Sequence, residues 1–305
     1  MIVVIGEALV DIIVDADGNI GSVVGGGPFN AARTIARLDQ PVMFMGPYSK
    51  DPFGRRIHEA LTADNVTMAF PDPVDAPSTI ALAQLDEGGA ATYRFLFDGS
   101  SATLVTPDQA LAALPADLTA IHAGTLGLVF EPLASATVAL VQNAPENCLV
   151  FIDPNCRPST VKDLAAYKAT LDAVLPRADI IKVSGDDVEF LRPDAKSTLE
   201  VAREWAKQYN AVVLLTDGAD AVHVVLPGAD MRLDVPQVDV VDTVGAGDSF
   251  GGGFLSWWMQ TGLDRSDLRD IDMVRNAAQF GIRVAGMTCE REGAQPPHLR
   301  EVEDQ

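Results

Sequence analysis

The sequence predicts an α/β fold of three layers, in which helices cover both faces of a mostly parallel central sheet, with a small β lid attached. Two observations predict the layers. From residue 120 on, short apolar runs alternate with helical patterns, as in parallel sheets covered on both sides. The first run, Ile2–Ile5, is apolar throughout, which is typical of a strand buried on both faces. A third observation, hairpin signals within the first hundred residues, predicts the lid.

The length and composition fit one large domain. Hydrophobic residues make up 48% of the 305 residues, which is ample for a sizeable core. No repeat, low-complexity tract or Pro/Gly-rich linker divides the chain. We therefore assign residues 1–305 to a single domain, with lid segments at about 12–24 and 76–98.

The net charge and the cysteine content indicate which binding partners and which cellular compartment to expect. The net charge of −21 argues against nucleic acid or an anionic membrane as a partner, because both would repel the protein. The cysteines, Cys148, Cys156 and Cys289, have neither the even count of a disulfide framework nor the C-x-x-C spacing of a zinc site. No signal-peptide pattern develops before Glu7, and no apolar run approaches membrane-spanning length. We expect a soluble, cytoplasmic protein.

The first strand, residues 2–5, precedes a hairpin or short excursion over residues 12–24. Glu7 and Asp11 lie just beyond this strand. In an open α/β sheet, ligands bind at the carboxyl ends of the strands, so Asp11 is a candidate ligand for a polyol. A loop carboxylate in solvent is the alternative interpretation of Asp11.

A glycine-rich segment, residues 25–32, leads into a helix that extends to Leu38. Gly26 and Gly27 would let a ligand approach the backbone closely, and Asn30 offers both a donor and an acceptor. This combination suits a hydroxyl-rich ligand. A glycine hinge capped by Asn30 is the alternative.

Residues 41–97 are expected to continue the sheet and complete the lid. The second lid hairpin contains Phe95 and Phe97, which share one face of a strand and are candidates for covering a ligand; aromatic residues at such positions also serve simply as core. The expected elements are a strand at 41–46, a loop to 54, a helix at 55–64, a short strand at 66–69, and a hairpin of 79–85 and 92–97 around the turn 86–89.

The regular βα part of the chain carries polar groups where strands end. Arg157 follows one such strand, and the planar guanidinium group is suited to binding phosphate. A salt bridge to a nearby carboxylate is the alternative role. Strands are expected at 120–123, 149–152, 179–183 and 212–216, with a helix ending at 141 and others at 164–175 and 199–209.

The glycine turn at residues 242–250 is the most informative stretch. It follows a β-leaning segment, 235–241, and precedes an apolar stretch, 254–259, that suits a buried helix. Gly245 and Gly247 would let several N–H groups point into one space, and a helix starting there adds the positive end of its dipole. Asp248 would repel a bound phosphate, so it is better suited to take a proton from an attacking hydroxyl. A helix N-cap is the alternative role of Asp248.

These motifs resemble the ribokinase/PfkB family of carbohydrate kinases. Residues 242–250 contain every fixed position of its D-T-x-G-A-G-D-[SA]-F signature. Residues 25–32 resemble the family's G-G-x-x-x-N-x-A pattern, and residues 153–157 resemble D-x-N-x-R. Two forms, G-G-x-P-F-N and T-C-x-R-x-G-A, look most like fructokinases. The resemblance extends from about residue 6 to 295 and implies a ribokinase-like fold.

The resemblance also implies roles for individual residues and cofactors. ATP and Mg²⁺ are the implied cofactors, with Asp187 organising Mg²⁺ through water and Asp242 near a monovalent cation, K⁺. The sequence departs from the family's N/S-x-x-E pattern at 184–187, which leaves open whether Asp186, Asp187 or Glu189 serves. A homodimer through the lid is a further expectation. The residues implied to be catalytic are Asp248, Gly245, Ala246, Gly247 and Arg157. Those implied to bind the sugar are Asp11, Gly26, Gly27, Asn30, Phe95 and Phe97, and those implied to bind the nucleotide are Ser184, Asp187, Thr216, Gly218 and Asn276.

The sequence therefore predicts an ATP-dependent sugar kinase that phosphorylates a primary hydroxyl. A nucleotide-dependent oxidoreductase would need G-x-G-x-x-G after the first strand, which is absent, and a P-loop enzyme would need a Gly-Lys pair, also absent. A sugar-binding protein that has lost catalysis would not need to retain Asp248 and both neighbouring glycines, Gly245 and Gly247.

A neutral sugar, fructose, is the predicted substrate. Similar acid-sugar kinases place an Arg near the end of the lid strand, where this chain has Asp98, and a carboxylate there would repel an acid sugar. Arg94 could reach the site instead. The alternatives are 2-keto-3-deoxygluconate, ribose and nucleosides.

Overall fold

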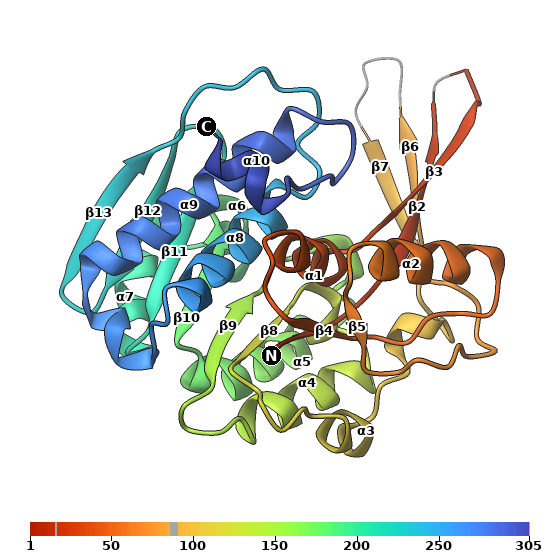
Figure 1. Cartoon of the computed structure of the whole chain (residues 1–305), viewed down its shortest axis with the longest axis horizontal. Coiled ribbons are helices and arrows are strands. Elements are labelled where there is room, and N and C mark those ends of the chain that lie inside the picture. Colours follow the sequence, from red (N-terminus) through yellow and green to blue (C-terminus); the bar gives the residue numbers. More distant parts are fainter. Residues whose placement is uncertain (16, 86–90, 305) are drawn as a thin grey trace.

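The computed structural model describes residues 1–15, 17–85 and 91–304, and its strands form two sheets. The central sheet has nine strands in the order β13-β12-β11-β10-β9-β8-β1-β4-β5 (Figure 1). All neighbours pair in parallel except β11 with β12 and β12 with β13, which are antiparallel. The strands are β1 (Ile2–Ile5), β4 (Val42–Met45), β5 (Thr67–Met68), β8 (Ala120–Gly124), β9 (Leu149–Asp153), β10 (Ile180–Ser184), β11 (Val212–Asp217), β12 (Ala221–Leu226) and β13 (Ala229–Asp234).

Helices cover both faces of this sheet. Alternate residues of β1 point to opposite sides: Val3 and Ile5 belong to the core layer that also contains residues of α4, α5 and α7, whereas Ile2 and Val4 belong to the layer that contains residues of α1, α2, α8 and α9. The predicted three-layer α/β/α fold is confirmed. The helices are α1 (Gly27–Arg37), α2 (Pro52–Ala63), α3 (Pro107–Ala112), α4 (Leu133–Gln142), α5 (Leu164–Val174), α6 (Gly185–Leu191), α7 (Thr198–Tyr209), α8 (Ala246–Gln260), α9 (Ile271–Cys289) and α10 (Leu299–Glu303).

One expected strand is wrong. Residues 235–241 form a loop, and the antiparallel strands β12 and β13 precede it. The β-branched side chains at 240 and 241 favoured an extended backbone, but Val240 and Val241 are 59% and 63% exposed, so they bury little apolar surface against a sheet. The loop instead carries the chain from the sheet edge to the glycine turn.

The second, four-stranded sheet projects from the body of the molecule, at the upper right of Figure 1. We call it the small sheet. Its order is β3-β2-β6-β7, with β2 and β6 parallel and the other pairs antiparallel. The expected turn at 86–89 lies outside the described residues. Its function as a lid, and as a dimer contact, stays a prediction. The strands are β2 (Leu9–Val14), β3 (Ile20–Gly25), β6 (Ile80–Leu85) and β7 (Ala91–Leu96).

The cysteines are free thiols, as expected. Cys148 and Cys156 are buried, and Cys289 is partly exposed. No helix within the described residues is long and apolar enough to cross a membrane.

Helix α8 contains three consecutive glycines that face three different neighbours. A Cβ added at Gly251 would lie 3.2 Å from the Phe151 ring of β9, and one at Gly252 would lie 2.8 Å from Thr34 Cβ of α1. A Cβ at Gly253 would lie 3.0 Å from Gly281 Cα of α9. The glycines therefore let α8 approach the sheet, α1 and α9 at the same time.

This close packing predicts that Gly252→Ala destabilises the protein. The added methyl group would overpack the α1 contact, which costs more than the gain in helix propensity, so we expect a net loss of about 1–2 kcal/mol. Urea unfolding measures it. Gly185→Ala is the matched control, because a Cβ at Gly185 meets no atom of the described residues within 4 Å. A Gly252→Ala protein as stable as the parent would contradict the packing argument.

Candidate active site

A cavity of about 340 Å³ lies at the carboxyl ends of the central strands. It lies where the strand order reverses, since the chain places β4 on one side of β1 and β8 on the other, and such switch points are where ligands bind in open α/β sheets. Glu7 follows β1, Thr125 follows β8 and Asn155 follows β9, and all three line the cavity. Thr125 and Asn155 have positive φ angles of 50° and 39°, a strain that clusters at functional sites.

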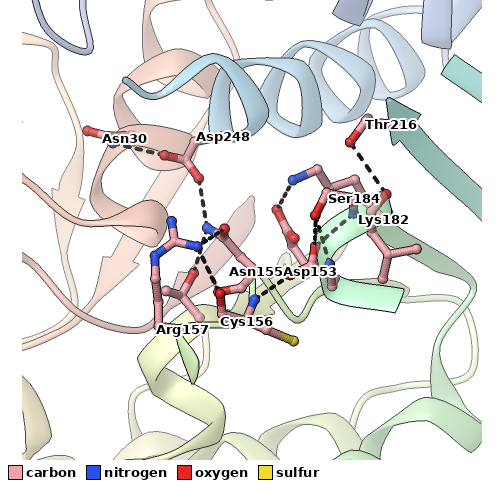
Figure 2. A network of polar contacts seen from close by, with 12 residues as sticks. Asn30, Asp153, Asn155, Cys156, Arg157, Lys182, Ser184, Thr216 and Asp248 are labelled. Carbon is pink, nitrogen blue, oxygen red and sulfur yellow. Dashed lines mark hydrogen bonds and ion pairs between the residues drawn. The ribbon is translucent and has the colours of Figure 1, made fainter. Parts of the chain in front are cut away.

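Asp248, in the first turn of α8, faces this cavity and is held by two amides (Figure 2). Asn30 Nδ2 donates to Asp248 Oδ2 at 2.9 Å, and Asn155 Nδ2 donates to Asp248 Oδ1 at 3.4 Å. Burial raises the pKa of Asp248, while the Asn30 hydrogen bond and the charges of Lys182 and Arg157 act in the opposite direction. The carboxylate is thus fixed in orientation and is more basic than an ordinary aspartate.

Glycine at position 27 lets the start of α1 come close to these groups. A Cβ on Gly27 would lie 2.6 Å from Thr125 Oγ1 and 3.1 Å from Asp248 Oδ1. Gly26 lines the cavity beside it. The segment predicted to approach a ligand therefore does form a wall of the cavity.

The glycine turn leaves two N–H groups for an anion. Gly245, with φ of 78°, precedes α8, and Ala246 N–H donates to Thr243 O at 3.2 Å, so this predicted donor is already used. The N–H groups of Gly247 and Asp248 make no hydrogen bond to the described part of the chain, as expected for a first helical turn. We call residues 243–248 the anion turn.

Lys182 adds a positive charge beneath the anion turn and was missed by sequence reasoning. Its Nζ lies 2.9 Å from the point where a Gly247 Cβ would stand and 2.9 Å from Asp153 Oδ2. Burial would lower the pKa of Lys182, but the carboxylates of Asp153, Asp187 and Asp248 outweigh it and raise that pKa. The signal was present: a lone lysine within an apolar central strand is almost never buried without a partner.

Asp187, one of the carboxylates that act on Lys182, is buried, whereas Asp186 and Glu189 are exposed. Its Oδ1 accepts Cys156 N–H at 2.6 Å, and its Oδ2 accepts Ser184 N–H at 2.7 Å. Within the described residues, no group of three His, Cys, Asp or Glu could hold a metal ion alone. Asp153 Oδ1 has no hydrogen-bond partner there. Two carboxylates fit Mg²⁺, which proteins usually hold through one or two carboxylates together with water and substrate phosphates.

The other predicted nucleotide residues lie outside the cavity. Ser184 and Thr216 are paired neighbours at the carboxyl ends of β10 and β11, and Thr216 Oγ1 donates to Val183 O at 3.4 Å. Gly218 follows β11, and Asn276 lies in α9, where its Oδ1 accepts from Arg275. The structure thus places Ser184 and Thr216 on adjacent strand ends, with Asp187 of α6 hydrogen-bonded to Ser184.

Arg157 lines the cavity and is exposed. Its Nη1 donates to Asn155 Oδ1 at 2.8 Å and to Cys156 O at 3.1 Å. It makes no ion pair with a carboxylate of the described residues, so the alternative role expected for it is not found. Its guanidinium charge remains available to a ligand.

The small sheet contributes some of the predicted sugar residues but not all. Asp11 and Phe95 line the cavity, and burial raises the pKa of Asp11 to about 6, with Arg157 acting to lower it. Phe97 does not line it. Phe97 packs with its ring centroid 4.5 Å from that of Phe130, beside a separate cavity of about 570 Å³.

The predicted effect of Asp98 on substrate choice is wrong. Asp98 is 93% exposed, borders the second cavity and lies 4.0 Å from Lys162. Arg94 borders the second cavity as well. Strand β7 ends at Leu96, so the residues after it leave the cavity wall. Neither side chain lines the first cavity.

Asp242 joins the anion turn to residues 290–297, which we call the C-terminal loop. Its Oδ1 accepts Val244 N–H at 3.0 Å and its Oδ2 accepts Gly293 N–H at 2.9 Å. Asp242 and Gly293 both line the cavity. A monovalent cation near Asp242 stays a prediction.

Glu7 is a buried acid of the cavity to which no role was assigned from the sequence. It is 1% exposed, its Oε2 accepts Leu126 N–H at 3.2 Å, and its Oε1 has no partner within the described residues. Burial raises its pKa to about 8, although hydrogen bonds from the backbone and the charge of Arg157 act to lower it. At neutral pH this side chain is therefore mostly a neutral acid that can donate a hydrogen bond.

The raised pKa of Glu7 predicts that the stability of the protein changes with pH. Between the ordinary value of 4.5 and about 8, the folded state binds a proton that the unfolded state has lost, so stability falls as pH rises through this window. Glu7→Gln removes this dependence. In urea titrations, we expect the free energies of unfolding of the parent and the Glu7→Gln protein to diverge by on the order of 1 kcal/mol per pH unit. Parallel stability curves for the two proteins would show that Glu7 titrates normally.

Comparison with known proteins shows the family to which this chain belongs. The sequence matches the pfkB family of carbohydrate kinases over residues 1–301. It is 31% identical over 263 residues to a fructokinase from Rhizobium leguminosarum bv. trifolii, covering 84% of this chain and 79% of that one. It is 28% identical over 294 residues to a fructokinase from Vibrio alginolyticus, covering 95% and 93% of the two chains.

Solved structures share the fold. A fructokinase from Xylella fastidiosa with bound ATP superposes with a TM-score of 0.89 at 24% identity, covering 99% of this chain and 97% of that chain. Aminoimidazole riboside kinase from Salmonella enterica, complexed with aminoimidazole riboside and an ATP analogue, gives 0.83 at 22% identity, with 99% and 98% coverage. The fold, the matched residues and the relatives agree, and the chain belongs to the PfkB family of carbohydrate kinases, phosphotransferases with an alcohol group as acceptor.

Proposed function

We propose that this sugar kinase is an ATP-dependent fructokinase. The observation that carries the proposal is the position of Asp248, held between Asn30 and Asn155 at the start of α8 and facing the cavity. A carboxylate fixed beside unpaired helix N–H groups combines a base with an anion site, which is what phosphoryl transfer to a hydroxyl requires.

In the proposed reaction, a primary hydroxyl of the sugar lies against Asp248. As its oxygen bonds to the γ-phosphorus of ATP, the bond from that phosphorus to the β,γ-bridging oxygen breaks, and ADP leaves. Asp248 accepts the hydroxyl proton. The N–H groups of Gly247 and Asp248, together with Lys182, stabilise the charge on the phosphoryl oxygens, and Arg157 reaches them from the cavity wall.

Mg²⁺ and a monovalent cation are part of the proposal. Asp187, through water, and Asp153 would hold Mg²⁺, which when bound neutralises phosphate charge. Support for a monovalent ion comes from a double mutant of Vibrio cholerae O395 fructokinase, solved in a form with fructose, ADP and a potassium ion bound. In this chain Asp242 is the residue we propose near such an ion.

The charges of the cavity favour a neutral sugar. Its wall contains the carboxylates of Asp11, Asp242 and Asp248 and the acid Glu7, against one lining arginine, Arg157. A substrate carboxylate among these groups would be repelled by about 1–4 kcal/mol per close pair, enough to reduce affinity severalfold or more. An acid sugar would thus be repelled by the acidic groups of the cavity wall and not by Asp98, which lies outside it. Val23 and Phe95 add apolar surface from the small sheet, which we propose covers the sugar.

An assay of ADP release against a panel of sugars tests this proposal. We expect kcat/KM to be highest for fructose, with 2-keto-3-deoxygluconate, ribose and aminoimidazole riboside well below it. The nucleoside is included because a kinase of that specificity shares the fold. A higher kcat/KM for any of the three competitors would overturn the assignment of fructose while leaving the kinase chemistry in place.

A further inference from the structure

A buried ion-pair network lies behind the active site and connects α1 and the end of α2 to the C-terminal loop. Asp64, the residue after α2, accepts from Arg33 Nε at 2.6 Å and from Arg37 Nε at 2.8 Å. The side chains of Asp64 and Arg33 are each 6% exposed, and that of Arg37 is 13% exposed. One carboxylate thus orients two guanidinium groups of the same helix.

The outer nitrogens of both arginines bind the C-terminal loop. Arg33 Nη1 donates to Ala294 O at 3.3 Å, and Arg37 Nη1 donates to Pro296 O at 2.8 Å. Their Nη2 atoms both reach Gln295 Oε1, at 3.4 and 3.3 Å. The loop is therefore held at three consecutive residues by groups whose direction Asp64 fixes.

The same loop supports the anion turn. Gly293 N–H donates to Asp242, and a Cβ on Gly245 would lie 2.6 Å from Ala294 Cβ, so the loop packs directly on the residue that precedes α8. Gly293 and Ala294 also line the cavity. A shift of the loop would move one wall of the cavity and the start of the helix that carries Asp248.

We propose that Asp64 is a positioning residue of the active site, which acts through Arg33 and Arg37 to hold the C-terminal loop against Asp242 and Gly245. Without its charge, two nearly buried guanidinium groups lose their common partner and turn toward other acceptors or solvent. The loop then loses its fixed donors. The kinetic part of this proposal rests on the proposed function, but the structural part does not.

Hydrogen exchange of the Asp64→Asn protein tests the proposal without using activity. We expect amides in residues 290–297 and 241–247 to exchange about tenfold faster, while those of β9, residues 149–153, keep the parent rate. In a coupled assay we expect kcat to fall about tenfold and KM for ATP to change less than twofold. Asp230→Asn is the matched control, because it removes the same charge and two hydrogen bonds to Arg203, of 2.9 and 3.0 Å, at the surface.

A second variant covers the case in which Asp64→Asn does not fold. Gln295→Ala removes the acceptor shared by both arginines from a partly exposed position of the loop itself. Faster exchange confined to the two segments, in either variant, supports the proposal. Uniform acceleration across the chain, or none in the two segments, overturns it. Should no sugar be phosphorylated at all, the proposed function fails and the exchange result still decides the positioning role.

Discussion

We expect the Asp248→Asn protein to lose about 10³-fold in kcat while its affinities for fructose and ATP stay within a few-fold of the parent values. Asparagine has the size of aspartate, and its one amide oxygen can still accept from Asn30 Nδ2 at 2.9 Å. Only the longer contact with Asn155 Nδ2, of 3.4 Å, is lost. What asparagine lacks is the ability to take a proton from the sugar hydroxyl. The loss should therefore fall on the chemical step and not on binding.

Single-turnover kinetics and calorimetric titration of each ligand separate the two effects. Asp98→Asn is the control, since it is the same substitution at an exposed residue outside the cavity, and we expect its kcat to match the parent. A kcat within tenfold of the parent for Asp248→Asn would exclude Asp248 as the base.

Lys182→Met should have the second largest effect, on both stability and catalysis. The substitution keeps an unbranched side chain that is one atom shorter, but it leaves the buried Asp153 carboxylate without its cation, and breaking a buried pair in this way costs about 3–5 kcal/mol. It also removes the positive charge beneath Gly247, so we expect kcat to fall about 10²-fold or more.

The double variant Lys182→Met/Asp153→Asn separates these two roles. Neutralising the partner removes the unpaired buried charge, so urea unfolding should show part of the lost stability restored. Activity should not return, because the cation is still missing and Asp153, a proposed Mg²⁺ ligand, has been changed as well. If stability and kcat recovered together in the double variant, Lys182 would act on catalysis only through the fold.

The buried strands of the central sheet could be predicted because burial on both faces leaves a continuous apolar run, as in β1 and β9. Strands β12 and β13 were missed. Strand β13 has the sequence ADMRLD and is mostly exposed at the sheet edge, so it carries no such run. It is a strand because it pairs with β12, and the local sequence of β13 does not reveal that pairing. Residues 235–241 have the opposite property, with β-branched side chains and no strand.

The candidate site could be predicted where one short segment carries the signal, as in the turn around Asp248 and the glycines before Asn30. It could not be predicted where function depends on contacts between distant segments. Lys182 becomes part of the site only because β10 passes under the start of α8, and Phe97 leaves the cavity only because β7 ends one residue earlier. These placements are set by strand order and strand ends.

The three glycines of α8 also have a consequence for how the enzyme becomes active. Each glycine in a helix interior costs about 1 kcal/mol of propensity, so residues 246–260 would hardly form a helix on their own. The segment is helical because α1, the sheet and α9 close around it. We therefore expect the base to reach its position only in the last cooperative step of folding, after residues 271–289 have been synthesised, so that an incomplete chain on the ribosome cannot consume ATP.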